Sequence, residues 1–271
     1  MSRVVDVDDP SHALLADFVA LGDPATRRRV ERDGDYFVVE GILAIERLLA
    51  LSDRWSIRSF ALLPKVAERL GPAIAAAAPD VPLAVVDEAV LREVVGFDLH
   101  RGALASVQRR APATLAELVP TARLLVAVEG VNDHENLGAL YRNAAAFGAD
   151  AVLLDDTSAD PFYRRSVRVS LGHVLGVPTG ALGSLPAGID ALRDLGATTL
   201  ALTPAAEVEL RDLDPSALGK GPIVVLVGAE GPGLIPTTLA AADHRVSIRM
   251  APGVDSLNVA TAAALALHHL A

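Results

Sequence analysis

Three short segments of the chain contain the polar and glycine residues that a binding or catalytic site would use. NLGALYR supplies an amide and a guanidinium, GAEGPG a carboxylate between glycines, and DSLNVATAAALAL a hydroxyl and a second amide. Glycine allows close backbone approach and conformations that other residues avoid. The residues concerned are Asn136, Gly138, Arg142, Gly228, Glu230, Gly231, Gly233, Ser256 and Asn258. Together they predict one ligand site assembled from three distant segments.

Each segment alone also has a purely structural interpretation. Asn136 and Ser256 are both suited to the N-cap of a helix, and a glycine loop often joins a strand to a helix. Glu230 between two glycines fits that interpretation less well. Asn258 is the hardest to explain structurally, because an amide that enters a buried apolar helix needs hydrogen-bond partners.

Residues 122–271 alternate between apolar, strand-like runs and helical runs. The strand-like runs are LLVAVEG, DAVLLD, TTLALT, IVVLVG and HRVSIRM, and the helical ones are NLGALYRNAAAFG, PFYRRSVRVSLG, AGIDALRDLG, LIPTTLAAAD and SLNVATAAALALHHL. This pattern predicts a parallel α/β sheet that is covered on both faces. Such sheets bind ligands outside the carboxyl ends of their strands, which is where the three segments lie.

Residues 1–111 show a separate alternation and are predicted to form a smaller α/β domain. Its strand-like runs are YFVVE, SIRSFALL, PLAVVD and ALASVQR, and its helical runs are GILAIERLLAL, VAERLGPAIAAAA and EAVLREVV. The proline-bounded residues 112–121 are interpreted as a linker. The predicted second domain is then 122–271.

Composition narrows the class of protein. With 271 residues, 51% of them hydrophobic, the chain can bury two modest cores. It contains no cysteine, which excludes disulfides and thiolate chemistry. The first residues lack the apolar run of a signal peptide and no run is long enough for a membrane span, so a cytoplasmic protein without membrane contact is predicted. No G-x-G-x-x-G or H-E-x-x-H occurs, which weighs against a nucleotide-binding oxidoreductase and predicts no metal.

The charge distribution is less simple than the total. A net charge of −10 argues against a nucleic-acid partner. The arginines nevertheless cluster, at residues 27–29 with Arg32, at 109–110, and at 164–165 with Arg168. Each cluster alone is typical of a solvated face, whereas the three together are compatible with a surface that contacts phosphate.

Taken together, the three segments resemble the three motifs of the SpoU (TrmH) branch of the SPOUT RNA methyltransferases. The first motif of that family is an Asn, a Gly two residues later and an Arg four residues beyond. The second is a glycine-rich turn around a Glu, and the third joins an Ile-x-Met strand end to Ser-Leu-Asn-Val. The matching residues are Asn136, Gly138, Arg142, Gly228, Glu230, Gly231, Gly233, Ile248, Met250, Ser256, Leu257, Asn258 and Val259.

The resemblance extends beyond the motifs, with two departures. Arg168, Ser170 and Gly172 are similar to an Arg-x-Ser-x-Gly stretch of the family, and residues 1–111 resemble more loosely a substrate-binding domain related to kink-turn-binding ribosomal proteins. Arg249 stands where the family usually has proline in the third motif. His134 stands where proline is common in the first motif. The first departure bears on the loop that would cover the cofactor.

The resemblance implies a fold, a cofactor and a reaction. The implied fold is a parallel-sheet SPOUT domain with a deep trefoil knot, preceded by the RNA-binding domain. The implied reaction is methyl transfer from S-adenosylmethionine to a ribose 2′-hydroxyl of RNA. The residues implied for cofactor binding are Gly228, Gly233, Ile248, Met250 and Leu257, and those for substrate binding are Asn136, Arg168, Ser170, Arg27 and Arg28.

The implied catalytic residues are Arg142, Glu230, Ser256 and Asn258. The family role of the arginine is general base, but a guanidinium keeps its proton at ordinary pH. Stabilising charge on the oxygen or fixing a phosphate are the alternatives, and the sequence leaves them open. The family also implies a homodimer through the C-terminal domain, and Ala260, Ala264 and Leu267 of the last helix are interpreted as either interface or core.

The substrate is predicted less sharply than the reaction. A two-domain chain of this length favours 23S ribosomal RNA over transfer RNA. A non-catalytic RNA-binding protein on the same fold is the alternative from another functional class, although all four catalytic residues are present.

Overall fold

The structure is a computed structural model that describes residues 4–23, 26, 35–99 and 102–271. The chain divides into two compact units. The first consists of Met1–Arg110 together with Phe162–Leu175, and the second of Ala111–Pro161 together with Gly176–Ala271. Residues 112–121, interpreted above as a linker, thus lie in the second unit, and a segment from the middle of the chain belongs to the first.

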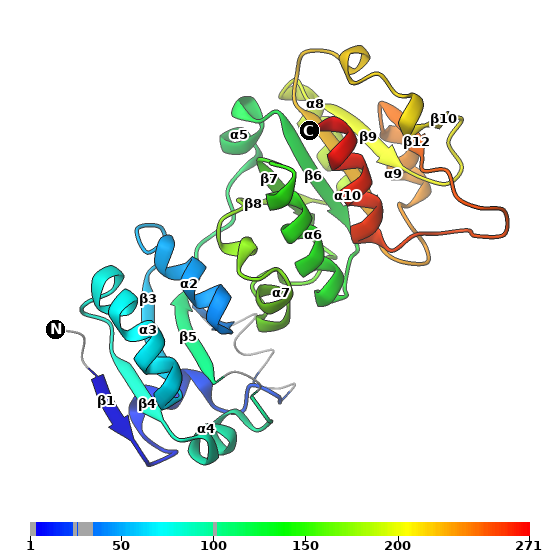
Figure 1. The fold of residues 1–271 in the computed structure, drawn as a ribbon. Helices are drawn as coiled ribbons and strands as arrows, with labels where there is room; N and C mark the ends of the chain where they lie inside the picture. The colour runs from blue at the N-terminus through cyan, green and yellow to red at the C-terminus, as the bar shows by residue number, and fades with distance from the viewer. Residues whose placement is uncertain (1–3, 24–25, 27–34, 100–101) are drawn as a thin grey trace. The chain divides into compact units, whose positions relative to one another are not determined.

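The first unit is built on a five-stranded mixed sheet with the order β1-β4-β3-β5-β2 (Figure 1). The pairs β1–β4 and β3–β4 are parallel, and β5 runs antiparallel to both β2 and β3. Its elements are β1 (Val4–Val7), a 3₁₀ helix (Ala13–Phe18), β2 (Tyr36–Glu40), α2 (Ile42–Ala50), β3 (Ile57–Leu62), α3 (Pro64–Ala77), β4 (Leu83–Val86), α4 (Glu88–Val95), β5 (Ala103–Gln108), α7 (Arg164–Val169) and a 3₁₀ turn (His173–Leu175). The predicted strands and helices of residues 36–108 are confirmed, whereas β1 carried no signal that the sequence analysis used.

Aromatic contacts and a hydrogen bond fix the segment Phe162–Leu175 in the first unit. The rings of Phe37, Trp55 and Phe162 pack with centroids 4.9 to 5.4 Å apart. The Trp55 indole donates to the Leu175 carbonyl at 2.9 Å. Gly172 has φ +77°, and a Cβ there would lie 2.9 Å from Cα of Ala44. The tight turn that ends α7 therefore needs glycine.

The second unit is built on a seven-stranded sheet, in the order β10-β12-β9-β11-β6-β7-β8, with every pairing parallel. The predicted parallel α/β sheet is confirmed. Its elements are α5 (Leu115–Leu118), a 3₁₀ turn (Val119–Thr121), β6 (Leu124–Glu129), α6 (His134–Ala146), β7 (Ala151–Asp155), β8 (Thr179–Gly183), α8 (Leu185–Asp194), β9 (Thr198–Leu202), β10 (Val208–Glu209), two 3₁₀ turns (Leu210–Asp212 and Pro215–Leu218), β11 (Ile223–Gly228), α9 (Pro236–Ala241), β12 (His244–Ser247) and α10 (Val259–Leu270).

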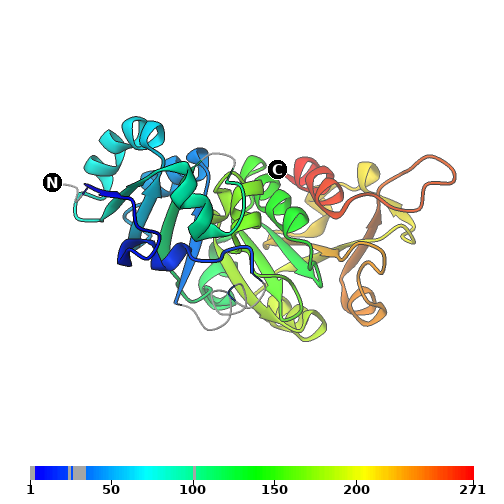
Figure 2. The same ribbon diagram turned by 90° about the horizontal axis from the view of Figure 1, so that it is seen from below.

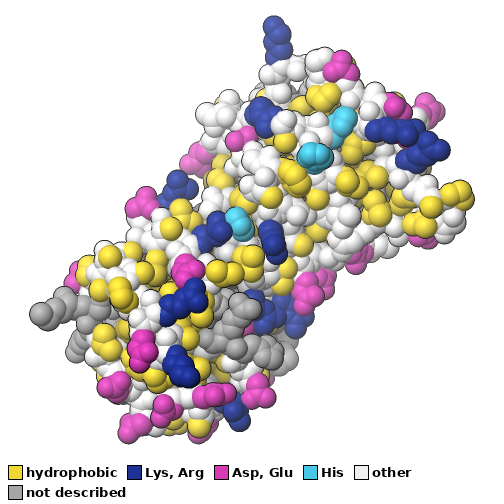
Figure 3. Space-filling model, in the orientation of Figure 1, with side chains coloured by type: hydrophobic (Ala, Val, Ile, Leu, Met, Phe, Trp, Pro, Cys, Tyr) yellow, Lys and Arg dark blue, Asp and Glu magenta, His cyan; other side chains and the backbone are white. Residues whose placement is uncertain are grey.

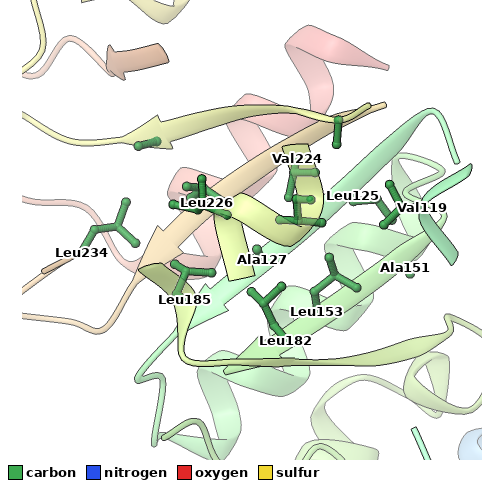
Figure 4. Close-up of a cluster of buried hydrophobic side chains, with 14 residues drawn as sticks. Val119, Leu125, Ala127, Ala151, Leu153, Leu182, Leu185, Val224, Leu226 and Leu234 are labelled. Carbon is green, nitrogen blue, oxygen red and sulfur yellow. The ribbon is translucent and has the colours of Figure 1, made fainter. Parts of the chain in front are cut away.

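Helices cover both faces of this sheet, α6 and α10 on one side and α8 and α9 on the other (Figures 1 and 2). The α8 side buries an apolar cluster in which Leu185 and Ile189 pack onto Leu125, Leu153 and other strand residues (Figure 4). Because both faces are buried, the central strands are largely apolar, as the continuous runs of β6 and β11 predicted. Because these strands are parallel and packed by one core, the carboxyl ends of β6, β9 and β11 lie at the same edge of the sheet.

Three local expectations for the second unit were wrong or incomplete. β8 was missed because its sequence, TGALG, is rich in glycine. The strand predicted from HRVSIRM ends at Ser247, so residues 248–258 form an open loop, seen in orange to red in Figure 2. The helix predicted to begin at Asn136 begins two residues earlier at His134, capped by Asp133.

The surface is mixed in charge. On the face drawn in Figure 3, Lys and Arg side chains lie among acidic and apolar ones and form no single continuous field. No helix in the described part of the chain combines the length and apolar character that a membrane crossing requires.

Candidate active site

A pocket of about 220 Å³ opens at the carboxyl ends of β9, β11 and β12 in the second unit. Its walls are mostly apolar, with a few polar groups at the glycine-rich loop and near α10. The lining residues are Leu202, Thr203, Pro204, Val227, Gly228, Ala229, Glu230, Gly231, Pro232, Gly233, Leu234, Leu239, Ile248, Met250, Asp255, Ser256, Leu257, Val259 and Ala262. An apolar cleft with a few polar groups at this edge of a parallel sheet is the usual form of a ligand site.

The glycine-rich loop, residues 228–234, is shaped by its glycines. Gly231 and Gly233 have φ of +88° and +69°, in the region that side chains disfavour. A Cβ on Gly228 would lie 2.1 Å from the carbonyl carbon of Gly233, and Gly233 N–H donates to Ala229 O at 2.9 Å. The loop therefore folds back on itself, and Glu230 at its tip is exposed.

Asn258 connects the three segments that the sequence analysis singled out. Its Oδ1 accepts from the backbone N–H of Ala260 and Thr261, at 3.0 and 3.1 Å. Its Nδ2 donates to Asn136 Oδ1 and to Glu230 Oε1, each at 2.7 Å. The prediction that this amide needs partners is confirmed, and Asn258 rather than Ser256 is the N-cap of α10.

Asn136 is not the N-cap predicted for α6. Asp133 accepts from the N–H groups of Glu135 and Asn136, at 2.8 and 2.9 Å. The Asn136 side chain is thereby released from capping and bonds to Asn258 instead. The structure thus brings Asn136, Glu230 and Asn258 into one hydrogen-bonded cluster at the edge of the pocket.

Arg142 lies on the same helix as Asn136 and is exposed. Its guanidinium has no hydrogen-bond or ion-pair partner among the residues that the structure describes. Two neighbours set the position of α6: Asn143 Nδ2 donates to Ala260 O at 2.8 Å, and the Tyr141 hydroxyl lies 2.6 Å from Thr179 Oγ1. Burial raises the pKa of Tyr141 above its ordinary value and outweighs the hydrogen bond with Thr179, which lowers it. The phenol therefore stays protonated and anchors the helix.

The other residues predicted for catalysis and cofactor binding line the pocket. Ile248, Met250, Ser256 and Leu257 come from the open loop after β12, and residues 251–258 of that loop are all exposed. The Ser256 hydroxyl donates to Asp255 Oδ1 at 3.1 Å. Arg249, in place of the family's proline, is exposed between two residues that face the pocket.

The residues predicted for substrate binding are more dispersed. Arg168 belongs to the first unit, where it donates to Glu40 Oε1 at 3.0 Å. Ser170 is fully buried there and donates to Val167 O at 2.9 Å. Neither lines the pocket. Arg27 and Arg28 lie outside the described residues.

Sequence reasoning missed the contribution of β9. Leu202, Thr203 and Pro204 line the pocket directly after that strand. The signal was present, because TTLALTP is an apolar strand that ends in polar and proline residues at the ligand-binding edge. Glu129 at the end of β6 was missed as well, since one carboxylate after an apolar run gives no sign of its partners.

The described part of the chain contains no group of three or more His, Asp or Glu side chains arranged to hold a metal ion. His269 lies 2.8 Å from the Leu213 carbonyl, and the ring of His268 packs against Phe147. These histidines therefore have structural contacts at the end of α10.

Comparisons with known proteins give the same family as the motifs. Residues 123–268 match the model of the SpoU rRNA methylase family. An uncharacterized tRNA/rRNA methyltransferase of Mycobacterium tuberculosis is 40% identical over 265 residues, which cover 98% of this chain and 91% of the relative.

Solved structures agree over both units. An AdoMet-bound rRNA methyltransferase from Sinorhizobium meliloti has a TM-score of 0.80 at 26% identity, covering 98% of this chain and 97% of that one. An RNA 2′-O ribose methyltransferase has a TM-score of 0.72 at 27% identity, covering 100% and 98%. From its motifs, its fold and these relatives, the chain belongs to the SpoU family of RNA methyltransferases.

Proposed function

We propose that this protein transfers a methyl group from S-adenosylmethionine to a ribose 2′-hydroxyl of 23S ribosomal RNA. The observation that carries the proposal is the hydrogen-bonded cluster of Asn136, Glu230 and Asn258 beside an apolar pocket, with Arg142 exposed on the helix that bears Asn136. The cluster lies at the edge of the pocket, and the guanidinium of Arg142, which has no partner among the described residues, is available to an RNA oxygen that becomes negatively charged.

The residues of the pocket fit S-adenosylmethionine. Apolar side chains such as Ile248, Met250 and Leu257 offer contacts for an adenine ring, and the glycine loop from Gly228 to Gly233 brings backbone groups to the same cleft. When bound, the cofactor supplies an electrophilic methyl group on a sulfonium. The AdoMet-bound relative from Sinorhizobium meliloti supports this assignment.

We assign Arg142 the role of contacting the ribose oxygen that attacks the methyl carbon. The cofactor, held by the pocket, would supply the methyl group to the ribose oxygen and leave as a neutral thioether, and the hydroxyl proton would pass to solvent water. A guanidinium keeps its own proton, so Arg142 stabilises the negative charge on the oxygen rather than acting as the base. Asn136, Ser256 and Asn258 orient the ribose, and Glu230 fixes the glycine-rich loop. Alignment of this kind accounts for much of the rate in intramolecular reactions.

Ribose methylation and ribosomal RNA are supported by two solved structures that cover 98% or more of this chain. One is named RNA 2′-O ribose methyltransferase and the other rRNA methyltransferase. The first unit, with Arg27, Arg28 and Arg168, is proposed to bind the RNA. The predicted role of Ser170 in substrate binding is not retained, because its hydroxyl is buried and bonded to Val167 O. A 2′-hydroxyl is most accessible in single-stranded or loop RNA, where nucleotides are splayed out.

The family also supports three proposals about the whole protein. The C-terminal domain carries the trefoil knot of its family, which periodicity alone does not predict because threaded connections are rare. The protein is a homodimer through that domain, so Arg142 acts on a cofactor held mainly by the other subunit. It works in the cytoplasm, where its RNA substrate is made.

Calorimetry with S-adenosylmethionine, with a nicotinamide dinucleotide as control ligand, tests the cofactor. Micromolar affinity for the methyl donor alone is expected, on the order of −8 kcal/mol.

The purified protein is then incubated with labelled cofactor and either 23S ribosomal RNA or total transfer RNA, and methylated riboses are mapped. If transfer RNA receives the labelled methyl group and ribosomal RNA does not, the proposed substrate changes to transfer RNA. Methylation of bases would overturn the ribose assignment. Binding of RNA without methyl transfer would favour a non-catalytic RNA-binding protein.

A further inference from the structure

Glu129, the last residue of β6, has a carboxylate that is hydrogen-bonded on both oxygens. The residue is 6% exposed. Its Oε2 accepts from the backbone N–H of Ile235 at 2.8 Å, and its Oε1 accepts from the Thr238 hydroxyl at 2.6 Å. Thr238 is fully buried on α9. A buried carboxylate that accepts two good hydrogen bonds holds its partners firmly, because leaving either donor unpaired is costly.

Glu129 lies beside both ends of the glycine-rich loop. Its backbone is paired in register with Gly228, the first residue of that loop. Its carboxylate bonds to Ile235, the residue directly after the loop. One residue at the carboxyl end of β6 therefore lies beside the beginning of the segment through its backbone and holds the end of the segment through its side chain.

Between these two ends the loop has little other support. Residues 230–232 are exposed. The loop is closed by the Gly233 to Ala229 hydrogen bond, and Glu230 at its tip accepts from Asn258. Without the carboxylate, Ile235 would be held only by the packing of its neighbour Leu234 and of α9, and ligand binding would have to order the loop at an added entropic cost.

We infer that Glu129 is a positioning residue for the cofactor: it holds the glycine-rich loop at both ends and so keeps the pocket in its binding shape. This inference rests on the proposed function, since it assigns the pocket to S-adenosylmethionine. Glu129 does not itself line the pocket. Its backbone lies beside Gly228, which does, and its carboxylate acts through Ile235, the residue directly after the lining residue Leu234.

Glu129→Gln tests the inference with almost no change of volume. A glutamine has one acceptor oxygen, so one of the two donors then faces an NH₂ group. We expect the Kd for S-adenosylmethionine to rise about tenfold or more, with a parallel rise in the KM for the cofactor. The kcat at saturating cofactor stays within about twofold, because the reacting groups are unchanged. Thr238→Val removes the other half of the contact and is expected to act in the same direction, while Thr238→Ser retains the hydroxyl and the affinity.

Asp243→Asn is the matched control. The Asp243 carboxylate also accepts from a backbone N–H and a threonine hydroxyl, both of Thr199, at 2.9 and 2.6 Å. It lies just before β12, at the edge where the strands begin, and so away from the pocket. We expect this variant to lower the thermal midpoint while leaving the Kd for the cofactor unchanged.

The outcomes separate the inference from the proposed function. If the wild-type protein binds no S-adenosylmethionine, the proposed function fails and the inference fails with it. If the wild type binds but Glu129→Gln and Thr238→Val bind equally well, only the inference is overturned. It is also overturned if Asp243→Asn weakens binding as much as Glu129→Gln does, because the effect would then come from general loss of stability.

Discussion

At the residue scale, Asn258 performs two tasks with one amide. Its oxygen caps α10, and its nitrogen donates to Asn136 and Glu230. An Asn is suited to both tasks because it has an acceptor and two donors on one short side chain. Serine, threonine or aspartate could cap the helix as well but could not donate twice.

Substitution of Asn258 should separate these two tasks. Asn258→Asp keeps the cap but places a carboxylate against Glu230, whereas Asn258→Ala loses both the cap and the cluster. We expect methylation to fall at least about a hundredfold in both variants, and the free energy of unfolding to fall by about 1 kcal/mol in the alanine variant alone. Thermal unfolding and single-turnover methylation measure the two effects. Full activity in the aspartate variant would mean that only capping matters.

Arg142 is expected to contribute to the reaction and not to the fold. It is exposed and has no partner in the described chain, so Arg142→Ala should leave the thermal midpoint within about 2 °C, as for most surface substitutions. Methylation should fall by about 10²- to 10³-fold, as for loss of a group that stabilises an oxyanion. Arg142→Lys keeps the charge but not the planar fork. Recovery by lysine would indicate a role for charge alone, and normal turnover in the alanine variant would refute the assignment.

At the scale of elements, α7 is held to the first unit by an ion-pair cluster. Glu40, the last residue of β2, accepts from Arg164 at 2.6 Å and from Arg168 at 3.0 Å. The side chain of Glu40 is 7% exposed and that of Arg164 17%, whereas Arg168 is 41% exposed. The guanidinium of Arg164 also lies 4.2 Å from the ring centroid of Phe97. The Glu40–Arg164 pair is therefore the part of the cluster that is shielded from water.

Glu40→Gln should destabilise the first unit by about 3 kcal/mol, because removing one partner of a buried ion pair leaves the other charge uncompensated. Glu46→Gln is the control, since the Glu46–Arg69 pair has side chains that are 39% and 58% exposed and should contribute less than about 1 kcal/mol. Trp55 is the only tryptophan and is buried in this unit, so its fluorescence during urea unfolding reports on the unit directly. Equal losses in the two variants would contradict the role of burial.

At the scale of the whole molecule, an acidic chain has to bind a polyanion. With a net charge of −10, binding has to rely on local arginine clusters and on the electrostatic attraction that each phosphate contact provides. Two subunits that place their arginine clusters on one RNA would offset the unfavourable negative net charge. One side chain of α10 offers a contact for pairing, because Leu265 is 43% exposed. Of the three residues interpreted above as interface or core, Ala260 and Leu267 are buried and Ala264 is half-buried.

RNA affinity is expected to fall steeply with salt, and Arg27→Ala with Arg28→Ala should reduce the slope. Each phosphate contact with single-stranded RNA contributes about −0.7 to the slope of log K against log salt concentration. The double variant should therefore lose about 1.4 from the slope. Arg69→Ala with Arg92→Ala removes two arginines that are already paired with carboxylates and serves as the control. An unchanged slope would remove Arg27 and Arg28 from the RNA-binding surface.

Leu265→Glu tests the proposed dimer. A charge on an exposed apolar residue of α10 should shift the protein toward the monomer at micromolar concentration in sedimentation velocity, because a buried unpaired carboxylate opposes association. Leu43→Glu, at an equally exposed leucine of the first unit, is the control. A wild-type protein that sediments as a monomer would refute the dimer, and a dimer unaffected by Leu265→Glu would place its interface elsewhere.

The sequence by itself determined most of the helices and strands and singled out the residues that are proposed for the site. Apolar strands and amphipathic helices are local patterns, so the runs around YFVVE and IVVLVG predicted their strands correctly. Glycine and capping residues mark turns by local chemistry, which placed Gly228, Glu230 and Asn258 at one edge of a parallel sheet. The family motifs supplied the rest.

Tertiary structure alone decided which of these side chains touch. That Asp133 caps α6 and frees Asn136 for Asn258 depends on where two loops meet across 122 residues of sequence. The segment Phe162–Leu175 joined the first unit because Phe162 and Arg164 found partners there in Trp55 and Glu40. The support that Glu129 gives to the glycine-rich loop likewise depends on the register of β6 with β11. Hydrogen bonds between distant segments follow from strand order and packing, and neither leaves a periodic signal in the chain.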